Sequence, residues 1–150
     1  MSKVAALNFH ILDLDILGGA CARLGLELVH GQRQYRWYGN RGQQEALPAG
    51  FTREELGMCE HAIRIPNNES AYEIGIVSRR DGNPGYALLW DSWNGGYGLT
   101  DAIGKDGARL YQQYSLGMTI RQIEIDNLCI LEQTTDTQGN IHLTVGVQGA

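Results

Sequence analysis

The chain has 150 residues, of which 43% are hydrophobic and 19% charged, and its formal net charge is −5. These values are typical of a soluble globular protein, and the length suits a single domain, 1–150, with a sizeable core. The acidic balance disfavours binding of duplex nucleic acid over the whole surface, although it leaves a local basic groove open. Because there is no apolar run of about 18 residues, we expect no membrane partner.

The first part of the chain alternates short strand patterns with one helix pattern. We predict strands at Val4–Ile11, Leu26–Val29 and Gln34–Tyr38. Apolar residues between the first two have helical spacing, and either Asp13 or Asp15 is suited to cap that helix. The three cysteines form no Cys-x-x-Cys pair, so we expect buried thiols in a reducing cytoplasm and a cytoplasmic protein.

The middle of the chain has the pattern of an antiparallel meander. Three strand patterns, at Cys59–Ile65, Tyr72–Val77 and Tyr86–Trp90, are separated by turns at Pro66–Asn68 and Asp81–Gly85. Tight turns between consecutive strands produce antiparallel neighbours. We therefore expect these strands to form the centre of a sheet.

The last third of the chain predicts helices followed by two strands. We expect a short helix after Thr100 and a longer one within Ala108–Asn127. Leu128–Glu132 predicts a strand, and the alternation that starts at Ile141 predicts a final strand with one buried face. The predicted fold class is α+β, with a mostly antiparallel sheet and two main helices packed on one face. The other face would then be partly open and available as a binding platform.

A cluster of arginine and aromatic residues follows the second strand. Arg33, Tyr35, Arg36, Trp37 and Arg41 lie within nine residues that contain no acid. Aromatic rings that stack on bases, with arginines nearby, hold single-stranded nucleic acid without reading its sequence. The alternative is a half-buried strand whose arginine stems cover apolar surface.

Asp91 lies between Trp90 and Trp93 at the expected end of a strand. An acid beside apolar rings has its pKa raised, which is how a general acid is made, and Glu73 on the neighbouring strand is a candidate partner. The alternative is an aspartate that pairs with an arginine such as Arg36 or caps the bend. We favour the alternative, because no nucleophile and base can be placed beside Asp91.

Two further patterns carry little functional signal. The amides of Asn94–Gly98 could cradle an anion, but the stretch lacks the lysine of a P-loop and the spacing of a dinucleotide fingerprint, so a tight turn is favoured. Cys59 and His61 share one strand face without the third and fourth ligands that a metal site requires, so we expect no metal and no cofactor.

The central strands resemble those of an uncharacterised family. Tyr72–Ile76 and then Tyr86–Trp93 are similar to the family of the hypothetical chloroplast open reading frame thirty-five type, which occurs in plastid genomes, cyanobacteria and some phages. The turn at Tyr38–Gly42, the segment Tyr111–Tyr114 and the closing strands at Leu128–Val145 also resemble it.

The resemblance covers most of the chain apart from Gln43–Gly57, which looks like an insertion, and the bend at Trp93–Gly98 is richer in glycine than the family pattern. Within the insertion, Thr52 and Glu55 have the form of a capping box, which predicts a helical turn or two. The family has no established activity and lends no catalytic residues. The resemblance implies a soluble intracellular protein and a protein partner of the AAA-type ATPase class.

We therefore expect a non-enzymatic adaptor that binds a protein partner through an aromatic and arginine surface, because Trp, Tyr and Arg dominate interface hot spots. The two alternatives are single-stranded nucleic-acid binding and an enzyme with Asp91 as acid or base. The candidate binding residues are Arg33, Tyr35, Arg36, Trp37, Arg41, Trp90, Asp91 and Trp93.

Overall fold

The computed structural model describes residues 1–147 and divides into two compact units, Met1–Tyr114 (unit 1) and Ser115–Ala150 (unit 2). The boundary falls within helix α3, Ala108–Ile125. Helices combine with sheets in which every strand pair is antiparallel, so the predicted α+β class is confirmed. The assignment of 1–150 to a single domain stays a prediction.

Unit 1 contains a five-stranded antiparallel sheet in the order β1-β5-β4-β3-β2. Its strands are β1 (Val4–Ala6), β2 (Glu27–His30), β3 (His61–Arg64), β4 (Ile74–Ser78) and β5 (Tyr86–Asp91). The consecutive pairing of β3, β4 and β5 confirms the predicted meander. The pairing of β1 with β5 brings Val4 opposite Asp91, so the start of the chain lies beside the end of the central strand.

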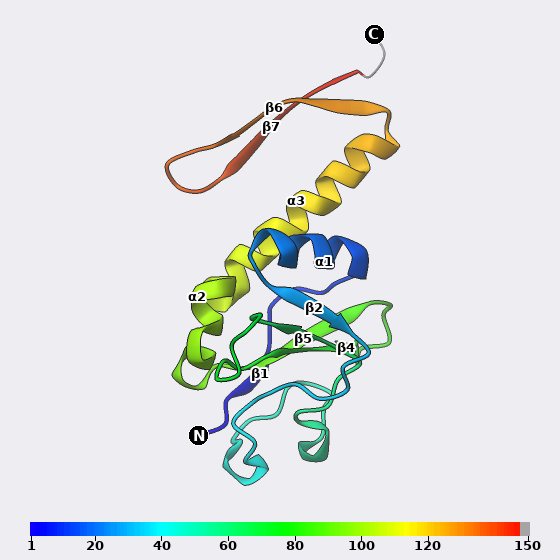
Figure 1. Cartoon of the computed structure of the whole chain (residues 1–150). Helices are drawn as coiled ribbons and strands as arrows, with labels where there is room; N and C mark the ends of the chain where they lie inside the picture. Colours follow the sequence, from blue (N-terminus) through cyan, green and yellow to red (C-terminus); the bar gives the residue numbers. More distant parts are fainter. Residues whose placement is uncertain (148–150) are drawn as a thin grey trace. The chain divides into compact units, whose positions relative to one another are not determined.

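Two helices, together with the part of α3 up to Tyr114, lie on one side of this sheet (Figure 1). They are α1 (Leu14–Arg23) and α2 (Leu99–Ile103). Asp13 caps α1, because its Oδ1 accepts a hydrogen bond of 3.1 Å from the Ile16 amide. The Tyr114 hydroxyl accepts a bond of 2.9 Å from the Leu12 amide, which ties the start of α3 to the entry of α1.

The opposite face of the sheet is covered, so the expectation of a partly open face was wrong. The long segment between β2 and β3, cyan in Figure 1, lies over that face. It contributes apolar residues that pack against the sheet, and Trp37 packs on their margin. The cluster consists of Val4, Tyr35, Phe51, Leu56, Cys59, Ala62, Val77, Ala87 and Leu89. Phe51 and Leu56 belong to the stretch interpreted as an insertion, which therefore supplies part of the core.

We call the segment between β2 and β3 the covering segment. It does not contain the regular strand that was predicted at Gln34–Tyr38. Only an isolated bridge between Gln34 and Met58 has strand geometry there. Two short 3-10 turns follow, at Arg41–Gln43 and Arg53–Glu55. The second turn is the predicted capping box, and the Thr52 amide donates to Glu55 Oε1 at 2.9 Å. Two backbone bonds flank the bridge between Gln34 and Met58: the Tyr35 amide donates to the Gly57 carbonyl and the Cys59 amide donates to the Arg33 carbonyl, both at 2.9 Å.

Unit 2 comprises the end of α3 and the hairpin of β6 (Leu128–Thr135) and β7 (Ile141–Val147), which form a separate two-stranded sheet. The Asp136 carboxylate closes the turn by accepting bonds of 2.9 Å from the Gln138 and Asn140 amides. Within residues 1–147, no helix has the length and apolar character needed to cross a membrane.

Candidate functional site

A left-handed turn follows β5 and is the most unusual backbone feature of unit 1. Four consecutive residues, Asn94 to Tyr97, have φ between 49° and 65° and ψ between 20° and 47°. Glycine adopts this conformation freely and asparagine visits it as a single residue, but a residue such as tyrosine loses roughly 1–2 kcal/mol in it. Tyr97 is therefore strained, and such strain persists only where the surrounding structure imposes it.

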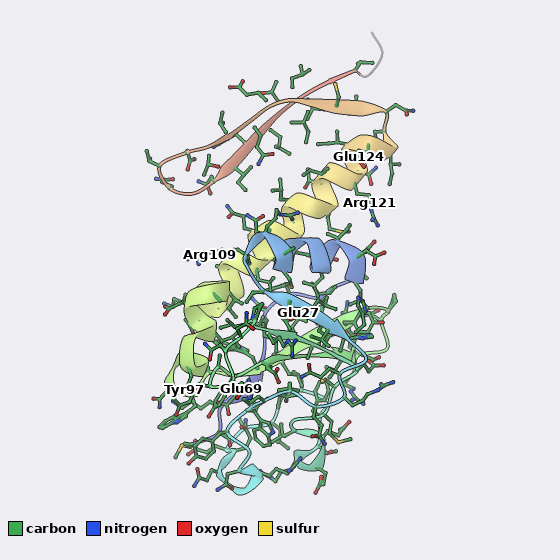
Figure 2. All side chains as sticks on the ribbon, viewed as in Figure 1. Glu27, Glu69, Tyr97, Arg109, Arg121 and Glu124 are labelled. Atoms are coloured by element: carbon green, nitrogen blue, oxygen red, sulfur yellow. The ribbon has the colours of Figure 1, made fainter. Side chains whose placement is uncertain are left out.

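The turn is held by its neighbours on both sides. The Gly95 amide donates to the Ser92 carbonyl at 3.0 Å, and the Tyr72 amide donates to the Gly96 carbonyl at 2.9 Å. A Cβ at Gly96 would lie 2.9 Å from the Cβ of Leu99, so only glycine permits the close approach of the turn to α2. These contacts direct the Tyr97 side chain outward at the start of α2 (Figure 2).

Four aromatic rings gather around the turn. Tyr38 meets Trp93 edge to face with centroids 6.3 Å apart, and Tyr72 meets Tyr97 at 5.1 Å. Burial, followed by the neighbouring Asp91, Tyr97 and Tyr38, raises the pKa of Tyr72 to about 12. We call Tyr38, Tyr72, Trp93 and Tyr97 the aromatic turn surface. Tyr38 is 40% exposed and Tyr97 is 44% exposed, so half of the surface is accessible to a partner.

The surface already binds one cation of the chain. The Lys3 ammonium lies over the Trp93 ring, 5.7 Å from its centroid. Lys3 and Ser92 also line an open cavity of about 330 Å³ between the start of the chain and Gln44–Ala46. Cationic side chains bind aromatic faces by attraction to the ring quadrupole, and Lys3 shows that the Trp93 ring accepts one.

Asp91 lies directly beneath this surface and is completely buried. Its Oδ1 accepts hydrogen bonds of 3.0 Å from the Lys3 and Trp93 amides, and its Oδ2 accepts one of 3.0 Å from the Tyr38 amide. Asp91 therefore joins the start of β1, the bend and the covering segment. The bonds confirm that it caps the bend, whereas the suggested pairing with Arg36 was wrong. With both oxygens bonded and no exposed area, Asp91 is out of reach of a substrate.

The residues of the predicted arginine and aromatic surface do not form one surface: some are buried in the core and others bond to backbone carbonyls. Tyr35 is only 2% exposed, and a Cβ on Gly75 would come within 2.3 Å of its ring. The guanidinium of Arg36 donates to the Ala71 carbonyl at 2.7 Å, and that of Arg41 to the Leu56 carbonyl at 2.8 Å. These residues anchor the covering segment, so Tyr35 cannot stack on a base.

The remaining predicted residues lie apart from one another. Trp90 is 6% exposed and alternates with the residues that face the covering segment, so it faces the helices. Trp37 is half-buried, and the Arg41 guanidinium covers its ring at 5.5 Å. Arg33 is exposed in the covering segment. Of the tryptophans proposed as contacts, Trp93 is thus the one that belongs to the aromatic turn surface.

Sequence reasoning missed three members of this surface, Tyr38, Tyr72 and Tyr97. Tyr97 had a signal in the sequence, because a tyrosine between glycines in Gly-Gly-Tyr-Gly follows a turn and is displayed by it. Tyr38 and Tyr72 had none, since they are brought to the turn by bonds from the Tyr38 amide to Asp91 and from the Tyr72 amide to Gly96.

Cysteine and metal chemistry have no support in the part of the chain that the structure describes. The Cys59 thiol donates to the Gln32 carbonyl at 3.1 Å, and burial raises its pKa to about 12. Burial likewise raises the pKa of Cys21 to about 12, so both thiols are poor nucleophiles at neutral pH. Among residues 1–147, no group of three or more His, Cys, Asp or Glu side chains is placed to hold a metal ion.

The chain has no match among family models, curated proteins or solved structures.

Proposed function

We propose that the protein is a non-enzymatic adaptor that binds a protein partner through the aromatic turn surface. The observation that carries the proposal is the strained display of Tyr97, whose φ of 54° places an aromatic residue where glycine would cost less. Backbone strain of this kind is concentrated at sites of function. Tyrosine and tryptophan bury large rigid areas on binding, which makes them frequent hot spots.

The geometry favours a partner that presents arginine or lysine within an apolar surround. The Lys3 ammonium over Trp93 is an internal example of this contact. The net charge of −5 also attracts a basic partner. The resemblance to the plastid and cyanobacterial family implies an AAA-type ATPase, which is the first class of partner to look for.

The test uses the full-length tagged protein as bait in a lysate of its source, with and without nuclease. We expect the bait to capture a protein, and this capture should survive nuclease. The captured amount should fall at least about tenfold in Trp93→Ala and Tyr97→Gly, since hot-spot truncation costs ~2 kcal/mol or more. Tyr97→Gly is the sharper variant, because it removes the ring while relieving the left-handed strain. It should therefore leave the thermal stability unchanged or raised.

Two matched controls separate the surface from the fold. Asn94→Gly changes the same turn and removes the bond from Asn94 Nδ2 to the Tyr97 hydroxyl but keeps every ring, and Tyr111→Ala removes an aromatic residue that is 52% exposed on α3. Both should capture the partner as the wild type does. Capture that persists in Trp93→Ala and Tyr97→Gly contradicts the proposal. Capture that nuclease abolishes would instead favour nucleic-acid binding by the segment from Arg33 to Arg41.

A further inference from the structure

Unit 2 buries very little of its apolar surface. Within its described residues, 115–147, Ile123 is the one residue that is buried, at 8% exposed. Leu131 is 66% exposed and Val147 is 70% exposed. Figure 2 shows side chains projecting from both faces of the hairpin. A two-stranded hairpin is marginally stable in water and requires further strands or a packed layer.

One face of the hairpin is apolar and carries no charge. The pairs Leu128 with Val147 and Ile130 with Val145 place four apolar side chains together. A bulge between Ile130 and Glu132 adds one residue to β6. Beyond it, Gln133 and Thr135 of β6 share the face of Ile130, and this face continues to the turn. Its members are Leu128, Ile130, Gln133, Thr135, Ile141, Leu143, Val145 and Val147. Glu132 lies on the opposite face, across from Thr144.

The two edges of the hairpin differ in how they are protected against pairing. β6 carries a bulge and the charge of Glu132, which are common devices for blocking a sheet edge. The seven residues of β7, Ile141–Val147, contain no Lys, Pro, Asp or Glu. In β7 the unpaired amides and carbonyls of the outer edge therefore remain suitable for another strand.

We propose that β7 pairs edge to edge, antiparallel, with β7 of a second copy of the chain. The product is a four-stranded sheet, β6-β7-β7-β6, whose apolar faces join into one continuous surface. This inference is independent of the aromatic turn surface, which belongs to unit 1.

A second copy fits this edge better than a foreign partner, for reasons of symmetry, charge and concentration. Antiparallel pairing of one strand with itself is symmetric, so both copies use the same surface. β7 carries no Lys, Asp or Glu that would repel the same strand of a second copy, and the Asp136 carboxylate at the turn is bonded to His142 of β7 at 2.9 Å. Finally, a second copy is present wherever the chain is made, and its concentration rises with that of the chain.

The first test measures the mass of the full-length protein in solution by light scattering, from about 1 to about 100 µM. We expect a mass of twice 16.6 kDa that decreases on dilution. Val145→Lys places a charge on β7 at a residue that is 39% exposed, so the hairpin tolerates it while two copies repel. The variant should have the single-chain mass. Thr134→Lys, an exposed change on β6, is the matched control and should keep the doubled mass.

A single-chain mass for the wild type over the whole range overturns the proposal. A doubled mass that persists in Val145→Lys does so as well, because the contact then lies elsewhere.

The second test locates the paired strand by crosslinking and does not depend on how Val145→Lys folds. Thr144 is the midpoint of β7, so in the symmetric pairing it lies opposite its own copy. Opposed residues in antiparallel strands have Cα atoms about 4.5–5.5 Å apart, which suits a disulfide. With Cys129 changed to Ser and a mild oxidant added, Thr144→Cys should give a covalent dimer on a non-reducing gel. Thr134→Cys should not, and a dimer from that variant alone would overturn the pairing through β7.

Discussion

The segment between β2 and β3 contains a strand predicted at Gln34–Tyr38, and the hairpin of unit 2 contains a strand predicted from the alternation that starts at Ile141. In unit 1 the segment packs on the sheet, and Tyr35 and Leu56 are buried within it. In unit 2 the alternating hairpin leaves Val145 and Val147 exposed. A strand pattern in the sequence therefore indicates which side chains share a face, but it does not indicate what covers that face.

The polar residues of the two regions differ in the same way. Unit 1 buries Gln44, Glu73 and Asp91, and each bonds the backbone of the covering segment or of β1. Gln44 accepts from the Val4 amide and donates to the Val4 carbonyl, both at 2.9 Å, as a neighbouring strand would. A covering segment without regular strand pairing depends on such side-chain bonds, because buried backbone groups must be paired. The comparison predicts that unit 1 is sensitive to small changes that unit 2 tolerates.

The largest effect is expected for Asp91→Ala. The change leaves the Lys3, Trp93 and Tyr38 amides without their acceptor, and each buried unpaired donor costs roughly 1–3 kcal/mol. We expect the free energy of unfolding of unit 1 to fall by about 3 kcal/mol or more. Urea unfolding followed by tryptophan fluorescence measures it, since all three tryptophans lie in unit 1. The exposed change Glu69→Gln should have little effect, and an equal loss in both variants would contradict the role of Asp91.

The next effect compares one substitution in both units, Gly75→Ala and Gly146→Ala. At Gly75 the new methyl group would lie 2.3 Å from the ring of Tyr35, which is fixed in the core, so we expect a loss of about 1–3 kcal/mol. At Gly146 it would lie 2.8 Å from Leu131, an exposed side chain that can move, so we expect less than about 0.5 kcal/mol. Urea unfolding measures the first, and hydrogen exchange of the hairpin measures the second. Equal losses would erase the contrast between the units.

Among the substitutions in the core of unit 1, the smallest effect at neutral pH is expected for Tyr35→Phe. The Tyr35 hydroxyl is buried and makes no hydrogen bond of good geometry within residues 1–147, so its removal should change stability by less than about 1 kcal/mol. At alkaline pH the residue matters more. Burial raises the pKa of Tyr35 from 10 to about 12, with the Gly57 amide partly opposing the shift. The folded state therefore keeps the proton that the unfolded chain releases.

The stability contributed by the neutral Tyr35 is thus full below pH 10 and is lost as the pH rises to about 12. Unfolding of the wild type should become easier across this window. Tyr35→Phe should lose less stability there, while Tyr72 remains as a second titrating group because its pKa is also raised to about 12. The measurement is the urea midpoint of each protein between pH 10 and about 12. A parallel decline of the two midpoints would contradict the expectation.

The sequence by itself determined the elements whose signals are local. The meander of β3, β4 and β5, an aspartate cap before α1, the short helix before α3 and the capping box at Thr52 all depend on residues within a few positions of one another. The choice of Asp13 over Asp15 as that cap came from the structure. For the same reason the glycine run after Trp93 could be identified as a turn, although its left-handed geometry and strain could not.

Tertiary structure alone decided what covers each face of the sheet and where the aromatic rings meet. Tyr35 has the sequence appearance of a stacking residue, and only Gly75, forty positions later, gives its ring a place in the core. Asp91 has the appearance of a catalytic acid until the structure surrounds it with the nearby Trp93 amide and with amides from two distant segments, at Lys3 and Tyr38. Such contacts join residues far apart in the chain, and their energies depend on close packing and full hydrogen bonding. A pattern of residue types, read along the sequence, contains neither.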